Sequence, residues 1–513
     1  MSDEKSEKLS SVEVLKKESN YLRGTIAEEL QNDLSNFESG SVQLLKHHGM
    51  YQQDDRDMRM ANRKQGIKDK AFMMMLRTRI PGGKLSARQM LAEIDLCDEL
   101  GNNTLRLTTR QAIQLHGIYK RDLKEVIRRT NEVQMSTLGA CGDVNRNVMC
   151  CPAPYKNKVY DDIQAMADQI SEHFLPRTTA YHELWLSDLE TGEKELVGGG
   201  AEGHQLEPLY GTTYLPRKFK AAIGLDYDNC VDVYTNDLGL LAIIENNEIV
   251  GYNVLVGGGM GFTPAKKTTF PALAHKLAFV TPDQVIPVSE AIMKVQRDHG
   301  NRADRKQARM KYLIDHWGIE KFRQQVTDYY GECLPEPSEK DVTGFNDHIG
   351  WDEQGDGQWF YGLNVENGRV WDNDRVQLKS AIREICSTFE PEIRLTSHQS
   401  LIFSNIEEGS KGELTAILKK HNVQLSEEYS TVRRWSMACV AWPTCGLAIT
   451  ESERALPGIM DQLEPELSKL GLSQEAFTIR MTGCPNGCAR PYNPDIGLVG
   501  KAKNRYTMYL GGR

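Results

Sequence analysis

Four cysteines near the end of the chain form two closely spaced pairs. Five residues separate Cys439 from Cys445 in ACVAWPTC, and three separate Cys484 from Cys488 in TGCPNGC. Four thiolates delivered from two short loops can hold an iron–sulfur cluster. Both loops contain proline and glycine, which favour tight turns and leave backbone N–H groups free to point at sulfur. The pattern therefore predicts an iron–sulfur cluster between these loops.

Two other roles compete with this interpretation: a structural zinc site and buried free thiols. Zinc sites usually have two or four residues between paired cysteines. Free thiols do not require loops rich in proline and glycine, so we favour the cluster. Cys97, Cys150 and Cys151 are interpreted as buried structural thiols. The eleven cysteines are odd in number and irregularly spaced, which argues for a reducing compartment and against a disulfide framework.

A second set of reactive residues is positively charged and lies in the first half of the chain. Arg77 and Arg79 alternate in MLRTRI, as do Lys218 and Lys220 in YLPRKFK, so on a strand each pair shares one face. Arg146 lies between two asparagines. Arginine pairs with carboxylates through two hydrogen bonds, and lysine can deliver protons to a reducing anion. Any one of these charges could be a solvated surface group. Their repetition predicts a pocket for a polyanionic cofactor, a small anion, or both.

The composition limits the kinds of partner. The net charge of −9 opposes non-specific binding to nucleic acid, and it requires a local cationic pocket for any anionic substrate. The charged N-terminus has no apolar signal segment and no apolar run could span a bilayer, so we expect a cytoplasmic protein without a membrane partner. No dinucleotide-binding fingerprint is present, so electrons are expected from another protein.

Three further segments have less specific patterns. The glycines of LVGGGMG, at 257–261, lack the spacing of a nucleotide site, and we interpret them as backbone packed against a flat cofactor. His116 is interpreted as a contact to the core or to a cofactor. The charged run QQDDRDMR at 52–59 is interpreted as a solvated face, with a docking edge as the alternative.

A repeated motif divides the chain into two halves. RLTTRQ at 106–111 recurs as RLTSHQ at 394–399, and an isoleucine follows twelve residues after each arginine. A strand, a glycine turn and a helix precede each copy. The matching order of elements predicts a duplicated α+β unit whose copies pack about a pseudo-two-fold axis.

Taken together, these motifs resemble those of the sulfite and nitrite reductase family, which carries sirohaem coupled to a 4Fe–4S cluster. The resemblance covers nearly the whole chain and is closest to the sulfite reductase branch. The motifs are SNYLRGTIAEEL, HGMYQQDDRD, RLTTRQ, NRNV, YLPRKFK, VGGGMG, ACVAWPTC and TGCPNGCARP. Sirohaem carries many carboxylates, which would account for the excess of arginine and lysine.

The resemblance implies a role for each residue that matches a family motif. The cluster ligands would be Cys439, Cys445, Cys484 and Cys488, with Cys488 also bridging to the sirohaem iron. The substrate anion would be bound by Arg77, Arg146, Lys218 and Lys220. The expected sirohaem contacts are Arg106, Arg110, Gln114, His116, Arg217, Arg309, Lys311 and Asn486.

The resemblance also implies an α+β fold, with duplicated ferredoxin-like units and two larger α/β segments that bind sirohaem and the cluster. We expect an N-terminal extension over 1–65, ferredoxin-like halves over 66–135 and 335–425, and larger segments over 136–334 and 426–513. The family's chain continues beyond the final GGR, so the last segment is expected to be truncated.

The implied activity is assimilatory sulfite reduction, the six-electron conversion of sulfite to sulfide. The donor is either ferredoxin or an NADPH flavoprotein. STLGACGD and MKYLIDHWGIEKF resemble the ferredoxin-dependent subgroup, whereas SNYLRGTIAEEL and HGMYQQDDRD resemble the haemoprotein subunit that partners a flavoprotein; we favour ferredoxin. Sirohaem nitrite reduction and a non-haem cysteine–metal protein are the alternative functions.

Overall fold

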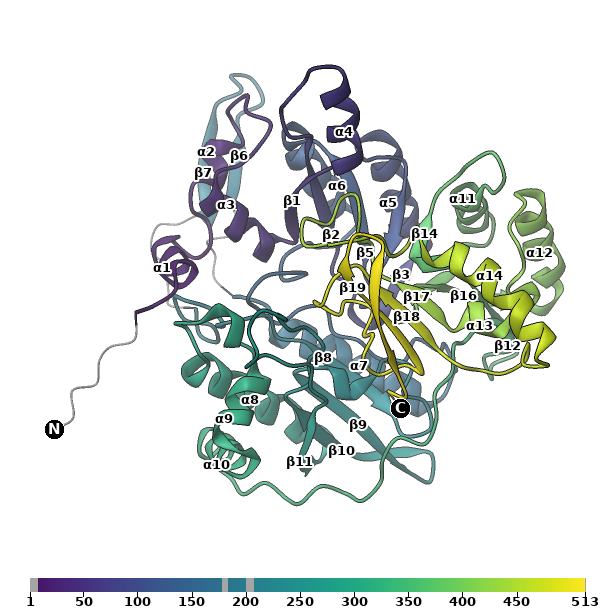
Figure 1. Ribbon diagram of the computed structural model, residues 1–513. Helices are drawn as coiled ribbons and strands as arrows, with labels where there is room; N and C mark the ends of the chain where they lie inside the picture. The colour runs from purple at the N-terminus through teal and green to yellow at the C-terminus, as the bar shows by residue number, and fades with distance from the viewer. Residues whose placement is uncertain (1–7, 178–182, 200–206, 513) are drawn as a thin grey trace.

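The computed structural model describes residues 8–177, 183–199 and 207–512 (Figure 1). Two five-stranded antiparallel sheets carry the repeated motif. The first has the order β1(Met50–Asp54), β2(Phe72–Arg77), β5(Ile113–Ile118), β4(Leu105–Leu107), β14(Arg369–Val370). The second has the order β12(Gly350–Glu353), β13(Gln358–Leu363), β16(Leu401–Glu407), β15(Glu392–Leu395), β3(Lys84–Ser86).

Each of these sheets takes its last strand from the other half of the chain. Strand β14 pairs with β4, and β3 pairs with β15, both antiparallel. In these pairs Arg106 lies opposite Arg369, and Arg394 lies opposite Lys84. The two arginines of the repeated motif therefore occupy equivalent places, and the predicted duplication about a pseudo-two-fold axis is confirmed.

Two helices pack on each sheet, and the two halves share one hydrophobic core. The helices are α5(Ala87–Glu99), α6(Leu123–Glu132), α11(Leu378–Phe389) and α12(Lys411–Lys420). Helix α5 begins in a reciprocal cap, because Ser86 Oγ accepts from the Gln89 amide (3.2 Å) and Gln89 Oε1 accepts from the Ser86 amide (2.9 Å). Leu76 and Leu115 of the first sheet belong to the same buried cluster as Phe403 of the second.

The first large segment follows the first half-unit. Its sheet has the order β11(His275–Val280), β10(Glu248–Val256), β9(Leu238–Glu245), β8(Ala221–Leu225), with β8 and β9 parallel. Its helices are α7(Lys158–His173), α8(Val285–His299), α9(Met310–Trp317) and α10(Ile319–Tyr330). Figure 1 shows α8, α9 and α10 grouped on one side of β9–β11. A separate hairpin pairs β6(Glu183–Ser187) with β7(Lys194–Gly199).

The last segment is built on a mixed four-stranded sheet. The order is β17(Ser436–Ala438), β18(Ile479–Thr482), β19(Ile496–Ala502), β20(Arg505–Leu510), and β17, β18 and β19 run parallel. Helices α13(Thr431–Arg434) and α14(Leu456–Lys469) accompany it. Parallel strands end at the same edge of a sheet, so the segments that follow β17 and β18 leave the sheet side by side.

The N-terminal region packs against both halves. Its helices are α1(Ser11–Glu18), α2(Ile26–Glu29), α3(Ser39–Leu44) and α4(Arg56–Lys64), and β1 forms an edge of the first half-sheet. The buried Lys16 ammonium donates to the Leu215 carbonyl over 2.7 Å. None of the helices in the described residues combines the length and apolar character that a bilayer crossing requires.

The charged run at 52–59 docks against the last segment, so its interpretation as a solvated face was wrong. Arg56 donates to the carbonyls of Pro443 (3.0 Å), Ala448 (2.9 Å) and Cys445, and its guanidinium lies 4.0 Å from the centre of the Trp442 ring. A guanidinium presents several donors in a fixed plane, so one side chain can fix the whole 443–448 loop.

This docking predicts a local effect of the Arg56→Ala variant. Three carbonyls would lose their donor, so amide exchange over 440–449 should become at least about tenfold faster, the equivalent of one lost charge-assisted hydrogen bond. Hydrogen–deuterium exchange with mass spectrometry measures this. Arg59→Ala is the matched control, because Arg59 on the same helix pairs with Asp54 and not with the loop. Unchanged exchange in Arg56→Ala would show that the loop holds its shape without this contact.

Candidate functional site

The two cysteine loops leave the last segment's sheet at one edge. Cys439 directly follows β17, and Cys484 lies two residues beyond the end of β18. The loops contact each other through backbone hydrogen bonds, because the Ile449 amide donates to the Gly483 carbonyl over 2.8 Å. Parallel strand pairing thus brings together two cysteine pairs that are far apart in the sequence.

The thiols lie close enough to influence one another. Burial and then the neighbouring Cys488 raise the pKa of Cys484 to about 11, and the same two causes raise the pKa of Cys439. The Gly483 amide donates to Cys439 Sγ and the Asn486 side-chain amide donates to Cys484 Sγ, both over 3.3 Å. Buried thiols such as these lose their protons when a metal binds, and the two donors are placed to stabilise the resulting thiolates.

The spacing of the four sulfurs favours a cluster over a single ion. Four ligands of one tetrahedral zinc ion lie about 3.3–3.8 Å apart. In the described part of the chain, such a tight group is formed by four other residues, whose ligand atoms all lie within 4.8 Å of one another: Cys151, Asp228, Cys230 and His348. The C-terminal cysteines form no such tight group, so they suit a larger, multi-atom centre.

A polar cavity lies between the first large segment and the cysteine loops. Its charged and thiol-bearing walls come from both halves of the chain: Arg110, Lys218, Lys220 and Arg309 on one side, and Asn486, Cys488 and Arg490 on the other. The structure therefore brings six of the expected site residues to one cavity. Arg490 was not among them, although it follows Cys488 by two residues in the same motif.

Backbone pairing explains why the two lysines meet Arg146. The buried Phe219 ring anchors the segment between them, and the Arg146 amide donates to the Phe219 carbonyl over 3.0 Å. Alternation along this extended segment directs Lys218 and Lys220 to one side. All three cations consequently lie within electrostatic reach of one another.

The cavity is strongly electropositive. Burial, followed by repulsion from Arg146, lowers the pKa of Lys218 well below its usual range. Burial, followed by repulsion from Arg110, does the same for Lys220. Both amines lose their charge as the pH rises through these lowered values. An anion placed between them removes the repulsion, so the cavity favours anionic ligands.

Arg77 and Arg146 belong to one connected group. Arg77 Nη1 donates to Cys141 Sγ over 3.0 Å, and Arg146 donates to the Gly142 carbonyl over 3.2 and 3.3 Å. Burial and then Cys141 raise the pKa of Tyr51, which both guanidinium groups oppose. Neither Arg77 nor Arg146 lines the wall of the cavity. Arg146 is near enough to lower the pKa values of Lys218 and Lys220.

Arg110 and His116 have buried nitrogens with no hydrogen-bond partner among the described residues: Nε of Arg110 and Nε2 of His116. Burial and then Arg146 lower the pKa of Arg110 to about 9. Burial and then Arg369 lower the pKa of His116 well below its usual range, so its imidazole is neutral. Unpaired buried donors carry a free-energy cost, and a cofactor that bears carboxylates would remove it. These residues fit sirohaem.

Gln114, His116 and Arg217 do not line the cavity. With its amide turned to accept, Gln114 Oε1 lies 3.2 Å from Arg77 Nε. Arg217 Nη1 lies 4.0 Å from Asp143 Oδ1, and burial followed by Arg305 lowers the pKa of Arg217 to about 10. Arg217 is half-buried, and its contact with Asp143 is long. Its positive charge is therefore only weakly neutralised, and a carboxylate could bind it.

Arg110 already donates to Asn236 Oδ1 over 2.9 Å and to the Ala221 carbonyl over 2.6 Å. Three other expected sirohaem contacts are likewise used by the protein. Arg106 Nε donates to Glu453 over 2.7 Å, and Arg309 donates twice to Asp237 over 2.9 and 2.8 Å. The Lys311 ammonium donates to two carbonyls of the VGGGMG loop over 2.8 Å. Arg309 still lines the cavity, but Arg106 and Lys311 act in this structure by fixing backbone.

The VGGGMG loop packs against the Cys484–Cys488 loop. A Cβ at Gly261 would lie 3.0 Å from the Asn486 carbonyl oxygen, and Gly487, with φ of 64°, faces the backbone and Cβ of Met260 at 3.0–3.2 Å. A Cβ at either position would press on the facing loop, and the positive φ of Gly487 also favours glycine. In the described residues the glycine loop therefore packs against the cysteine loop, and its expected packing against a flat cofactor stays a prediction.

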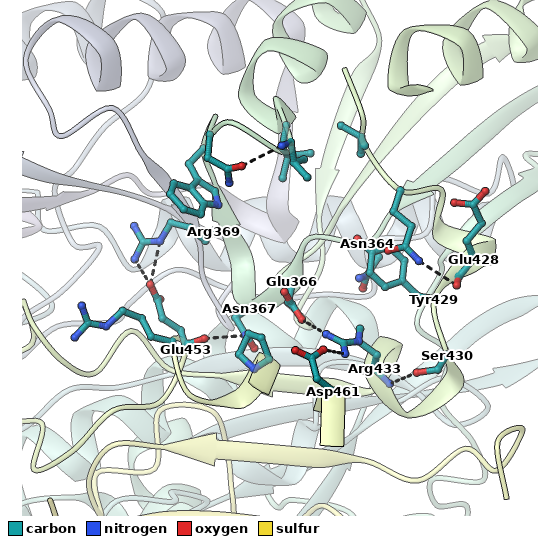
Figure 2. Close-up of a pocket in the computed structure, with 18 of the residues that line it drawn as sticks. Asn364, Glu366, Asn367, Arg369, Glu428, Tyr429, Ser430, Arg433, Glu453 and Asp461 are labelled. Atoms are coloured by element: carbon teal, nitrogen blue, oxygen red, sulfur yellow. Dashed lines mark hydrogen bonds and ion pairs between the residues drawn. The ribbon is translucent and has the colours of Figure 1, made fainter. Parts of the chain in front are cut away.

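A larger cavity of about 810 Å³ lies between the second half-unit and the last segment (Figure 2). Its cations are paired with acids: Arg369 lies 2.6 Å from Glu453, and Arg433 lies 2.7 Å from both Glu366 and Glu464. Figure 2 shows Arg433 held between acidic side chains. Because these charges are neutralised, the smaller cavity beside Cys488 is the better candidate for chemistry.

Two family signatures match this chain. Residues 141–334 match the "Nitrite and sulphite reductase 4Fe-4S domain", and residues 65–133 and 352–421 both match the "Nitrite/Sulfite reductase ferredoxin-like half domain". The second signature therefore covers both copies of the repeated unit. The solved structure of the Mycobacterium tuberculosis NirA protein is similar, with a TM-score of 0.78 and 25% identity, over 98% of this chain and 87% of that chain.

Named relatives match over almost the whole sequence. The sulfite reductase (NADPH) hemoprotein beta-component of Staphylococcus haemolyticus is 45% identical over 100% of this chain and 88% of its own length. The sulfite reductase (ferredoxin) of Synechococcus elongatus is 45% identical over 99% of this chain and 82% of its own length. The expected fold and cofactor set, sirohaem with a 4Fe–4S cluster, are those of this group.

These matches agree with a duplicated ferredoxin-like architecture, a cationic cavity and four converging cysteines. The chain belongs to the nitrite and sulfite reductase family.

Proposed function

We propose that this protein reduces sulfite to sulfide at a sirohaem coupled to a 4Fe–4S cluster. The observation that supports this most directly is the cavity in which Lys218 and Lys220 face Cys488 across the junction of the two halves. Relatives with 45% identity are named sulfite reductases. Cys439, Cys445, Cys484 and Cys488 are the proposed cluster ligands, with Cys488 adjoining the sirohaem.

When bound, the cofactors would relay electrons from the donor and supply the site at which sulfur is reduced. The chain's own cations bind the substrate and donate protons to it. Arg146 and the two lysines neutralise the oxyanion, and their N–H groups hydrogen-bond its oxygens. Each oxygen that leaves as water must receive two protons and two electrons. A lysine whose pKa is lowered toward the working pH is an effective proton donor to such an oxygen.

Arg110 and His116 are proposed to hold carboxylates of the sirohaem. Their unpaired buried nitrogens, Arg110 Nε and His116 Nε2, support this assignment. Arg217 and Arg309 are proposed to contribute positive charge at the rim of the cofactor cavity. Gln114 is proposed to orient Arg77. Arg106 and Lys311 are proposed to act indirectly, because their donors already hold Glu453 and the VGGGMG loop.

An external protein is the proposed electron donor. Cys445 lies in a loop whose Leu447 side chain is 70% exposed, so a cluster bound there lies near the surface. The named relatives differ in donor: one is an NADPH hemoprotein component and another is a ferredoxin enzyme, at equal identity. The ferredoxin dependence favoured from the sequence stays a prediction.

Replacement of Lys220 with methionine should separate cofactor binding from catalysis. The ammonium is lost at similar size, so the visible spectrum should persist. The kcat for sulfite should fall about 100-fold, as expected for loss of a proton donor. Steady-state turnover and absorption spectra measure the two effects. Lys124→Met, on the exposed face of α6, is the control. Undiminished kcat in Lys220→Met would remove this residue from the mechanism.

The Cys488→Ser variant tests the link between the two cofactors. If the Cys488 thiolate links the cluster to the sirohaem, its loss should abolish magnetic coupling between the two cofactors in Mössbauer spectra, and turnover with it. Cys333→Ser is the matched control, since Cys333 is an exposed cysteine outside the site. A coupled spectrum in Cys488→Ser would refute the assignment. A colourless wild-type protein containing zinc without iron would refute the whole proposal.

Donor and substrate preference are tested with the wild-type protein. We expect turnover with reduced ferredoxin, and none with NADPH and a flavoprotein reductase in its place. The reverse result would assign the chain to the haemoprotein-subunit group.

We also expect a higher kcat/KM for sulfite than for nitrite, and the opposite ratio would favour the nitrite reductase alternative.

A further inference from the structure

A second group of metal-ligating side chains lies outside the cofactor cavity. Its members are all buried, with 2–5% of each residue exposed, and their ligand atoms lie within 4.8 Å of one another: Cys151, Asp228, Cys230 and His348. We call this the thiol–histidine group. Cys151 was interpreted above as a structural thiol only, and its partners come from segments that the sequence does not connect.

Three separate segments deliver the four side chains. Cys151 lies just beyond Met149, which pairs with Ala222 at the start of β8. Asp228 and Cys230 lie in the turn that follows β8, and His348 lies in the linker that precedes β12. A group assembled from three buried segments is fixed by the fold.

The side chains of the group contact one another directly, at distances a few tenths of an ångström shorter than the edges around a tetrahedral ion. Cys151 Sγ lies 3.0 Å from Asp228 Oδ2 and 3.4 Å from His348 Nε2, and those last two atoms are 2.9 Å apart. The corresponding edges around a zinc ion with two sulfur ligands are about 3.3–3.8 Å. Outward shifts of a few tenths of an ångström would therefore admit the ion.

The ligand atoms face one another and are held by contacts within the group. Asp228 Oδ1 is occupied by the amides of Cys230 (3.2 Å) and Asn346 (3.0 Å), which leaves Oδ2 directed at the group. The other imidazole nitrogen, His348 Nδ1, is buried and has no hydrogen-bond partner among the described residues. The polar contacts of this ring are therefore all on the side of Cys151 and Asp228.

We propose that the thiol–histidine group binds one Zn²⁺ ion that has a structural role. Two sulfurs, one imidazole nitrogen and one carboxylate oxygen make a four-coordinate set that zinc accepts and that leaves no open position. Binding exchanges two thiol protons, and any imidazole proton, for the dication, and no electron is transferred. The ion would join the inter-half linker to the 228–236 turn, which supplies Val231, Thr235 and Asn236 to the wall of the cofactor cavity.

Metal analysis of the holoenzyme tests this proposal. The wild-type protein, equilibrated with zinc chloride and dialysed, should contain about one equivalent of zinc per chain, in addition to its iron, by inductively coupled plasma mass spectrometry. The variants Cys230→Ser and His348→Gln should lose most of this zinc. Cys386→Ser is the control, because Cys386 is an equally buried thiol in the second half-unit. Less than a tenth of an equivalent in the wild type, or full retention in both variants, would overturn the proposal.

A measurement on the wild type decides the question if the variants do not fold. Zinc K-edge X-ray absorption should show two sulfur scatterers at about 2.3 Å and two nitrogen or oxygen scatterers at about 2.0–2.2 Å. Three or four sulfurs would place the zinc in the C-terminal cysteines instead. A Cys151–Cys230 disulfide in peptide mass spectra would likewise overturn the zinc assignment. Neither result would affect the proposed sulfite chemistry, which depends on the iron cofactors.

Discussion

The structure depends on holding many like charges together in one cavity without an equal number of opposite charges inside it. Buried acids that pair with neighbouring cations reduce the free-energy cost of this repulsion. Asp143 pairs with Arg305 at 2.7 Å, Asp237 with Arg309 at 2.8 Å, and Asp232 with Arg480 at 2.6 Å. Burial alone would raise the pKa of Asp143, yet Lys16 and Arg305 hold it well below the usual range. The lowered pKa values keep Asp143 and Asp232 ionised, and the ion pairs of all three acids orient the cationic layer.

Other ion pairs, together with the one at Asp232, join the two halves of the chain. Glu453 of the last segment binds Arg106 of the first half-unit at 2.7 Å and Arg369 of the second at 2.6 Å. Asp232 of the first large segment binds Arg480 and Arg490 of the last. The ion pairs that neutralise these buried guanidinium groups therefore also hold the segments together. Loss of either acid would leave buried guanidinium groups unpaired, and it would also loosen the wall that carries the cofactor cavity.

The sequence reveals those parts of the structure that local patterns determine. The RLT motif predicts the duplication, and the two cysteine pairs predict converging loops, because turn residues and spacing act over short distances. The exchanged strands β3 and β14 have three and two residues, too few for any periodic signal, and tertiary pairing alone selects them. Arg56 lies in a run that is indistinguishable from a solvated surface until the 443–448 loop is placed beside it. The partners of Arg309 and Lys311 are likewise set by contacts between distant segments.

The pseudo-symmetry connects the cofactor site to the thiol–histidine group. Gln111 and Gln399 end the two copies of the repeated motif, and both have positive φ angles, of 49° and 67°. Gln111 donates to the Cys150 carbonyl and Gln399 to the Ala438 carbonyl, each over 2.9 Å. The residue that follows each carbonyl is a cysteine, Cys151 in one half and Cys439 in the other. Equivalent backbone positions in the two halves therefore present a thiol to the interior. One thiol lies among the four cysteines of the expected cluster, and the other meets a carboxylate and an imidazole, so the surrounding side chains decide which metal chemistry each position can support.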